Sequence, residues 1–199
     1  MERAPADTNL ARLLGEVRRC RHCAADLPLG PRPVLKAAAS ARILVIGQAP
    51  GTKVHETGIP WNDRSGDRLR DWMGVDRDTF YDERRIAIVP MGFCYPGRDP
   101  RGGDNPPRPE CAPLWHQRIL DLLPAIELTL LIGGYAQRRY LGARAAKSLT
   151  DTVTAWQSHL PGFFPTPHPS WRNTAWLKRH PWFEADALPV LRERVKALV

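Results

Sequence analysis

The stretch ARILVIGQAPG, residues 41–51, joins a continuous apolar run to a loop that carries two glycines and a proline. A short apolar run without polar alternation is typical of a strand that is buried on both faces of a parallel sheet. Two further runs have the same character, and a third is weaker: RIAIVPM (85–91), IELTLLIG (126–133) and PGFFPTPH (161–168). The sequence therefore predicts a parallel sheet of about four strands.

Helical patterns separate these runs. The spacing of apolar residues predicts helices at about 9–20, 66–74, 110–123, 134–142 and 148–158, and over the last segment, EADALPVLRERVKALV (184–199). Asp7, Thr8 and Asn9 are the candidate caps of the first helix. Alternating strands and helices predict an α/β fold, a three-layer α/β/α sandwich with helices on both faces of the sheet. A chain of 199 residues is expected to form one domain, spanning 1–199.

The charge balance indicates an acidic partner. Lysine and arginine number 29 against 21 acidic residues, which gives a net charge of +8. Such an excess favours nucleic acid as the partner, with a merely basic enzyme as the alternative. The first twenty residues lack the apolar core of a secretory signal, and no apolar run approaches the roughly 20 residues that span a bilayer. We therefore expect a cytoplasmic protein without a membrane segment.

Four cysteines form two pairs. Cys20 and Cys23 have C-x2-C spacing after the first predicted helix, and Cys94 and Cys111 flank the loop PGRDPRGGDNPPRPE (96–110). In the cytoplasm, free thiols or metal ligands are expected rather than disulfides. Four thiolates complete one tetrahedral zinc site or hold one iron-sulfur cluster. The alternative is that Cys94 and Cys111 are ordinary buried thiols.

Polar and glycine-rich segments follow the predicted strands. They are GQAPG (47–51), GFCYPGRDPRGG (92–103), GGYAQ (133–137) and HPSWRN (168–173). Ligands of parallel sheets bind outside the carboxyl ends of the strands, so these segments are expected to meet at one edge. A further stretch, GIPWNDRSGDRL (58–69), holds an aromatic ring, a carboxylate and a glycine turn within six residues.

Together these segments resemble the uracil-DNA glycosylase superfamily. ILVIGQAPG (43–51) resembles its motif A, GIPWNDRSGDRL resembles the segment with the base-stacking aromatic, and HPSWRN resembles motif B. The cysteine layout is similar to the iron-sulfur branches, types four and five. The run Asp-Arg-Ser-Gly-Asp after an aromatic residue, and His-Pro-Ser followed closely by Asn, resemble type five most. The resemblance implies the three-layer fold of that superfamily, excision of a base from DNA, and a [4Fe-4S] cluster, with zinc as the alternative. The implied ligands are Cys20, Cys23, Cys94 and Cys111.

The same resemblance implies roles for individual residues. Asp63 would position the attacking water or stabilise the cationic sugar, His168 would donate to the leaving base, and Gln48 would hold a water where many relatives have an acidic residue. Trp61 would stack on the flipped base, and Gly47, Ala49 and Gly92 would contact that base through their backbone. For Asp63 the alternative is a helix cap, and for Trp61 it is a core tryptophan.

HPSWRN also carries the expected contacts to DNA. Ser170 would bind a phosphate, Trp171 or Arg172 would enter the minor groove as a wedge, and Asn173 would cap the next helix or touch the DNA backbone. The asparagine that reads uracil in relatives has no counterpart near Pro90, Met91 and Gly92. That absence leaves uracil, hypoxanthine and xanthine open as substrates, as well as a loss of activity.

The sequence thus predicts a monofunctional base-excision glycosylase that leaves an abasic site, because no lysine lies in the matching motifs. A module that binds damaged or single-stranded DNA without cutting it is the main alternative. A hydrolase of free nucleosides or nucleotides is a third interpretation.

Overall fold

Strand β1 lies inside a four-stranded parallel sheet. The computed structural model describes residues 5–199, and its strands are β1 (Ile43–Ile46), β2 (Ile86–Ile88), β3 (Leu128–Ile132) and β4 (Phe163–Thr166). Their order is β2-β1-β3-β4, with Ile43 opposite both Ile86 and Leu128. The predicted parallel sheet is confirmed, although each strand is shorter than its apolar run.

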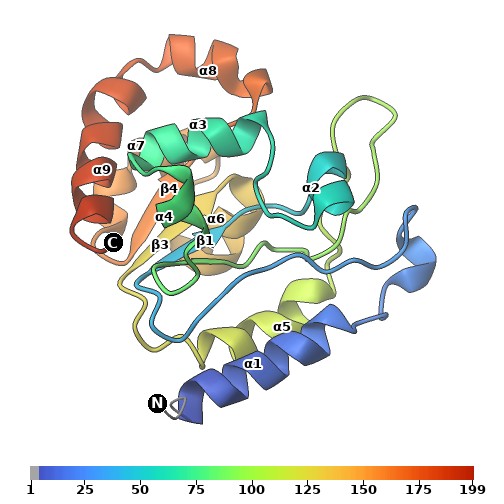
Figure 1. The fold of residues 1–199 in the computed structure, drawn as a ribbon. Coiled ribbons are helices and arrows are strands. Elements are labelled where there is room, and N and C mark those ends of the chain that lie inside the picture. The colour runs from blue at the N-terminus through green and yellow to red at the C-terminus, as the bar shows by residue number, and fades with distance from the viewer. Residues whose placement is uncertain (1–4) are drawn as a thin grey trace.

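Successive residues of β1 point to opposite faces of the sheet, so each face has its own core. Ile43 and Val45 pack with residues of α3 (Arg64–Met73) and α9 (Leu188–Lys196). Leu44 and Ile46 pack on the other side, under the helices α1 (Pro5–Arg18), α5 (Cys111–Leu120) and α6 (Gly134–Leu141). Figure 1 shows the two helical layers with the sheet between them. The predicted three-layer α/β/α architecture is confirmed.

The helices differ from the prediction in their ends and in three additions. Three short helices had no sequence signal: α2 (Thr52–Thr57), α4 (Arg77–Tyr81) and α8 (Thr174–Arg179). Helices of five or six residues are too short to display a periodic apolar face. The first helix begins at Pro5, ahead of the predicted caps.

Two long helix predictions are broken into pieces. The helix predicted at 148–158 is α7 (Leu149–Thr154) followed by a 3₁₀ turn, Trp156–His159. The last predicted helix begins as a π-helical turn, Phe183–Ala187, before α9. No helix within residues 5–199 is both long enough and apolar enough to cross a bilayer.

The long loop between Cys94 and Cys111 stands beside α2 at one side of the sheet, as Figure 1 shows in yellow-green. It pairs with itself through a bridge between Arg98 and Asp104. At its base, Met91 N–H donates to Gly47 O at 2.8 Å and Gly92 N–H donates to Gln48 O at 2.9 Å. These bonds attach the segment after β2 to the segment after β1, which forms one wall of the site.

Candidate functional site

A cavity of about 850 Å³ opens at the carboxyl edge of the sheet. Its lining comes from the loop after β1 and the start of α2, the segment that leads into α3, the long loop, and the HPSWRN turn after β4, with single residues such as Val34 and Pro90. Its polar and aromatic lining residues include Gln48, Trp61, Asp63, Arg98, Asp104, His168, Ser170, Trp171, Arg172 and Asn173. The segment GGYAQ does not line this cavity. Gln137 of that segment instead donates to Thr166 O at 2.9 Å inside the fold.

Two glycines leave room for Trp61. A Cβ built on Gly47 would lie 2.6 Å from Cζ2 of the indole, and one built on Gly66 would lie 1.7 Å from the Trp61 carbonyl oxygen. Trp61 itself has a φ of 55°, a conformation that costs a bulky residue about 1–3 kcal/mol. The buried Arg70 guanidinium donates to Trp61 O at 3.3 Å. The fold thus holds this tryptophan in a strained position at the cavity wall.

The Trp61 indole lies beside the imidazole of His168. Their ring centroids are 5.5 Å apart with planes inclined by 34°. Trp61 is partly buried, lines the cavity, and also packs against the core on the α3 side of the sheet. Trp61 therefore has one side at the cavity, as a base-stacking residue would, and another against the core, as a core tryptophan would.

His168 is held in one tautomer. The Ser170 N–H donates to His168 Nδ1 at 3.2 Å, so Nδ1 is an acceptor and the ring proton is on Nε2. Desolvation in the cavity wall lowers the pKa of His168 to about 4, although the carboxylate of Asp63 acts in the opposite direction. The imidazole is therefore neutral at physiological pH and presents an N–H donor.

Asp63 caps helix α3 and also lies at the cavity. Its Oδ1 accepts from Gly66 N–H at 2.8 Å and so caps helix α3. Asp63 also lines the cavity, and its charge acts on His168. The cap uses one carboxylate oxygen, which leaves Oδ2 for a ligand.

Three backbone contacts were predicted, and two of those residues lie at the cavity. Gly47 and Ala49 line it, as does Gln48, whose side-chain Nε2 donates to Asn105 O at 3.0 Å. Gly92 is not among the lining residues. It is buried, and a Cβ there would lie 3.0 Å from Pro107. The structure therefore places Gly92 in the packing behind the loop rather than at the cavity.

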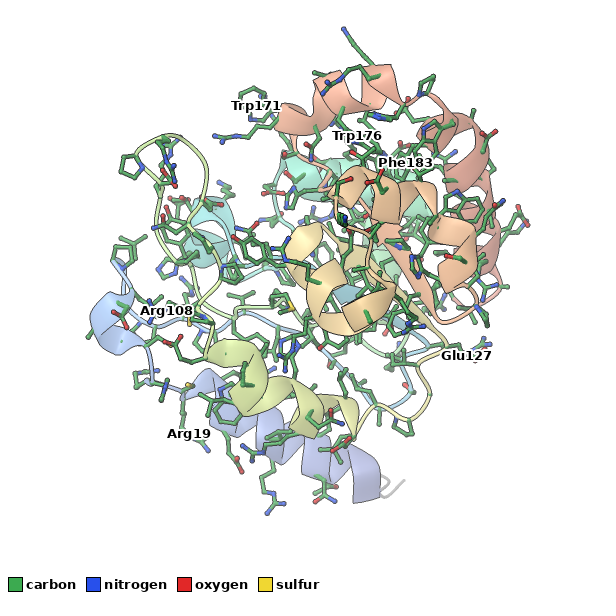
Figure 2. All side chains as sticks on the ribbon, turned by 180° about the vertical axis from the view of Figure 1, so that it is seen from behind. Arg19, Arg108, Glu127, Trp171, Trp176 and Phe183 are labelled. Atoms are coloured by element: carbon green, nitrogen blue, oxygen red, sulfur yellow. The ribbon has the colours of Figure 1, made fainter. Side chains whose placement is uncertain are left out.

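The HPSWRN turn forms the rim on the β4 side. Asn173 Nδ2 donates to His168 O at 2.7 Å, so this side chain braces the turn and makes no capping bond to α8. Arg68 of α3 donates to Ser170 O at 3.1 Å. Trp171 is 73% exposed, and Figure 2 shows it projecting outward from the body of the molecule. The Arg172 guanidinium lies over the Trp171 ring, 5.5 Å from its centroid.

One cavity residue was missed by the sequence analysis. Asp104 belongs to the long loop and lines the cavity together with Asp63. The loop is rich in proline, glycine and charged residues. A single carboxylate in such an irregular loop belongs to no periodic pattern or motif that would identify it. Only the folding of the loop against GQAPG brings it to the cavity.

The four cysteines gather at one small hollow. Cys20, Cys23, Cys94 and Cys111 all line a cavity of about 20 Å³, together with apolar residues such as Phe93 and Trp115. All four are free thiols. Desolvation, increased by the charges of the neighbouring thiols, raises the pKa of Cys94 to about 11 and that of Cys111 to about 12.

The four thiols have the chemistry of ligands for zinc or an iron-sulfur cluster. Phe93 N–H donates to Cys111 Sγ at 3.4 Å, a bond that favours the thiolate. A bound cation would offset the cost of ionising four crowded thiols. Their side chains are not pre-arranged for it: within residues 5–199, no three or more Cys, His, Asp or Glu side chains stand in metal-binding geometry.

The family model of the uracil DNA glycosylase superfamily matches residues 35–192. The chain belongs to this superfamily. The match covers all four strands and every residue that lines the larger cavity except Val34, and it begins after Cys20 and Cys23. Superfamily members act on DNA and hydrolyse the N-glycosidic bond between base and sugar.

Proposed function

We propose that this protein is a monofunctional DNA glycosylase that removes uracil or another deaminated base and leaves an abasic site. The observation that carries the proposal is the convergence of Trp61, Asp63 and His168 on one cavity of about 850 Å³. Pockets for small organic ligands occupy about 300–1,000 Å³, so this cavity has room for a flipped nucleotide.

The proposed chemistry follows the charges that develop as the bond breaks. The C1′–N bond breaks with its electron pair on the base, which leaves a cationic sugar and an anionic base. The free oxygen of Asp63 stabilises the sugar. The Nε2–H of His168 donates to a carbonyl oxygen of the base, and a neutral imidazole does this without giving up its proton.

Recognition of the base rests on stacking and backbone contacts. The Trp61 indole offers a face to the flipped base, and such stacking stabilises it by about 1–3 kcal/mol. The positive φ of Trp61 and the contact of its indole with Gly47 support a functional position, since strained backbone gathers at functional sites. Without a uracil-reading asparagine, we propose a broad preference that includes hypoxanthine and xanthine.

Contacts to DNA are proposed at the rim. Arg64, Arg98 and Arg172 line the mouth of the cavity and would neutralise phosphates. The exposed Trp171 is the proposed wedge that fills the gap left in the duplex. Its position at the rim of the cavity, where it lines the opening, supports this role.

We further propose that Cys20, Cys23, Cys94 and Cys111 hold a [4Fe-4S] cluster, with zinc as the competing occupant. The gathering of all four thiols at one hollow supports this assignment. Such a group supplies a covalent tie between the segment after α1 and both ends of the long loop.

The test is a single-turnover assay on oligonucleotides that contain uracil, hypoxanthine or xanthine. We expect the wild-type chain to remove at least one of these bases, and alkali treatment then breaks the strand at the abasic site. Asp63→Asn and His168→Ala should each lower the rate of base removal at least about 100-fold. Borohydride should trap no covalent adduct. Tight DNA binding without cutting would identify a non-catalytic module instead, and activity on free nucleosides that ignores salt would identify a small-molecule hydrolase.

A further inference from the structure

The long loop brings a second carboxylate to the cavity. It folds as a small hairpin. Asp99 N–H donates to Gly103 O at 2.9 Å, and the backbones of Arg98 and Asp104 form an antiparallel bridge. Gly102 and Gly103 at its tip have φ values of 98° and 101°, which allow the tight reversal. The reversal returns the chain to the cavity, where Asp104 and Arg98 both line it.

Asp104 lies against the GQAPG segment. A Cβ built on Gly51 would be 3.2 Å from Asp104 Oδ2, so the carboxylate stands next to the bare backbone of that glycine. The neighbouring Asn105 O accepts from Gln48 Nε2 at 3.0 Å, and Asn105 N–H donates to Gly97 O at 2.9 Å. These bonds fix the position of Asp104 beside the GQAPG segment at the cavity.

The carboxylate of Asp104 is available to a ligand. Within the part of the chain that the structure describes, it takes part in no hydrogen bond to protein and no ion pair within 4.0 Å. Asp63, by contrast, uses one of its oxygens to cap α3. Both oxygens of Asp104 can therefore accept hydrogen bonds from a water in the cavity.

We propose that Asp104 is the general base of the hydrolysis, and this inference rests on the proposed glycosylase function. The attacking water donates to the Asp104 carboxylate. The water oxygen forms its bond to C1′ as the C1′–N bond breaks, the electron pair leaves with the base, and the water's proton passes to Asp104. The departing base is stabilised by His168 and later takes a proton from solvent, and Asp104 returns its proton to solvent, so the hydrolysis consumes only one water.

The charges around Asp104 suit this role. Desolvation by the cavity wall and the nearby charge of Asp63 raise the pKa of Asp104, while Arg98 and Arg172 act against that rise. The raised pKa makes this carboxylate a stronger base than an ordinary aspartate. Asp63 and Asp104 thus divide the work, with Asp63 facing the sugar cation and Asp104 the water.

The test compares single-turnover rates of wild type and Asp104→Asn on the base that the wild type cuts best. We expect Asp104→Asn to slow cleavage by about 100-fold or more. DNA affinity should be unchanged or tighter, because a negative charge near the phosphates is removed. The matched control is Asp99→Asn, which removes the same charge from the same loop but from a residue that pairs with Arg101 and does not line the cavity.

A pH profile separates a base from a residue that only shapes the loop. The wild-type rate should rise with pH as Asp104 ionises and then level off, and Asp104→Asn should lose that acidic limb. Asp104→Glu should restore part of the rate and the limb. A cleavage rate of Asp104→Asn within about threefold of the wild-type rate, or a loss confined to DNA affinity, overturns this inference but leaves the proposed function standing. A wild type that cuts no base in the panel overturns the proposed function and the inference together.

Discussion

The indole of Trp61 and the backbone of Gly47 are in direct contact, with no room for a methyl group between them. A Cβ on Gly47 would stand 2.6 Å from Cζ2, closer than two carbon atoms approach without repulsion. The first residue after β1 therefore decides where the aromatic wall of the cavity lies.

Gly47→Ala should displace Trp61 into or out of the cavity. We expect a loss of about 1–3 kcal/mol in the free energy of unfolding and a larger relative loss in cleavage rate, because the stacking surface moves. Urea unfolding and single-turnover kinetics measure the two effects. Gly162→Ala is the matched control, since a Cβ there has no heavy atom within 4 Å. Equal behaviour of the two variants would contradict the contact.

Stability should fall as the pH falls through the histidine range. Burial lowers the pKa of His116 and of His168 to about 4 from the usual 6.5, so between these values the unfolded chain binds more protons. The contribution is complete above 6.5 and is lost progressively toward 4. Urea midpoints measured across this window should therefore decrease with acidity.

His116→Gln serves as the control for that prediction. The His116 ring is 1% exposed and bonds to Tyr140 Oη at 2.5 Å and to Pro90 O at 3.0 Å. Glutamine keeps a donor and an acceptor but does not titrate, so the variant should show a shallower pH dependence. A slope equal to that of wild type would mean that other groups set the acid sensitivity.

Trp171→Ala should separate duplex from single-stranded substrates. Because the side chain is 73% exposed, its loss should change the unfolding free energy by no more than about 0.5 kcal/mol. A wedge acts only where a base leaves a stack, so cleavage of duplex DNA should fall about tenfold or more while single-stranded cleavage changes little. Leu114→Ala, at an exposed apolar residue of α5, should affect neither. Equal losses on both substrates would assign Trp171 to general binding.

The cysteine hollow can be tested without any assay of activity. Protein purified without oxygen should be brown and contain iron and sulfide, and Cys94→Ser should lose both. His22→Ala is the control, because His22 lines the same hollow but supplies no thiol. A colourless protein with one zinc would favour the alternative occupant, and one that binds neither would leave the four cysteines as free thiols.

The sequence predicts the sheet well because its strands are buried on both faces. Runs such as ILVI have no polar interruptions, and all four burial patterns agree with this. Ends and breaks of helices were harder: the break at Ala155 and the π-helical turn before α9 depend on packing across the fold. Local periodicity does not contain that information.

For the site, residues inside compact motifs were found and residues placed by a distant segment were not. Trp61, Asp63 and His168 lie inside recognisable stretches. Asp104 reaches the cavity through a hydrogen bond between Gln48 and Asn105, two residues 57 positions apart, which no local pattern reveals. Gly92 is the reverse case: the resemblance implied a contact with the base, but Gly92 does not line the cavity and Pro107 lies over it.

The hairpin tip from Asp99 to Gly103 belongs to no helix or strand, and the bonds that anchor the loop lie at Gly97 and Asn105 below it. A change in its length can therefore leave the sheet intact, but it would move Gly102 and Gly103, which line the cavity next to Asp104. The same five residues therefore shape the rim of the cavity and set the place of its second carboxylate, so that access and chemistry would change together when this tip is altered.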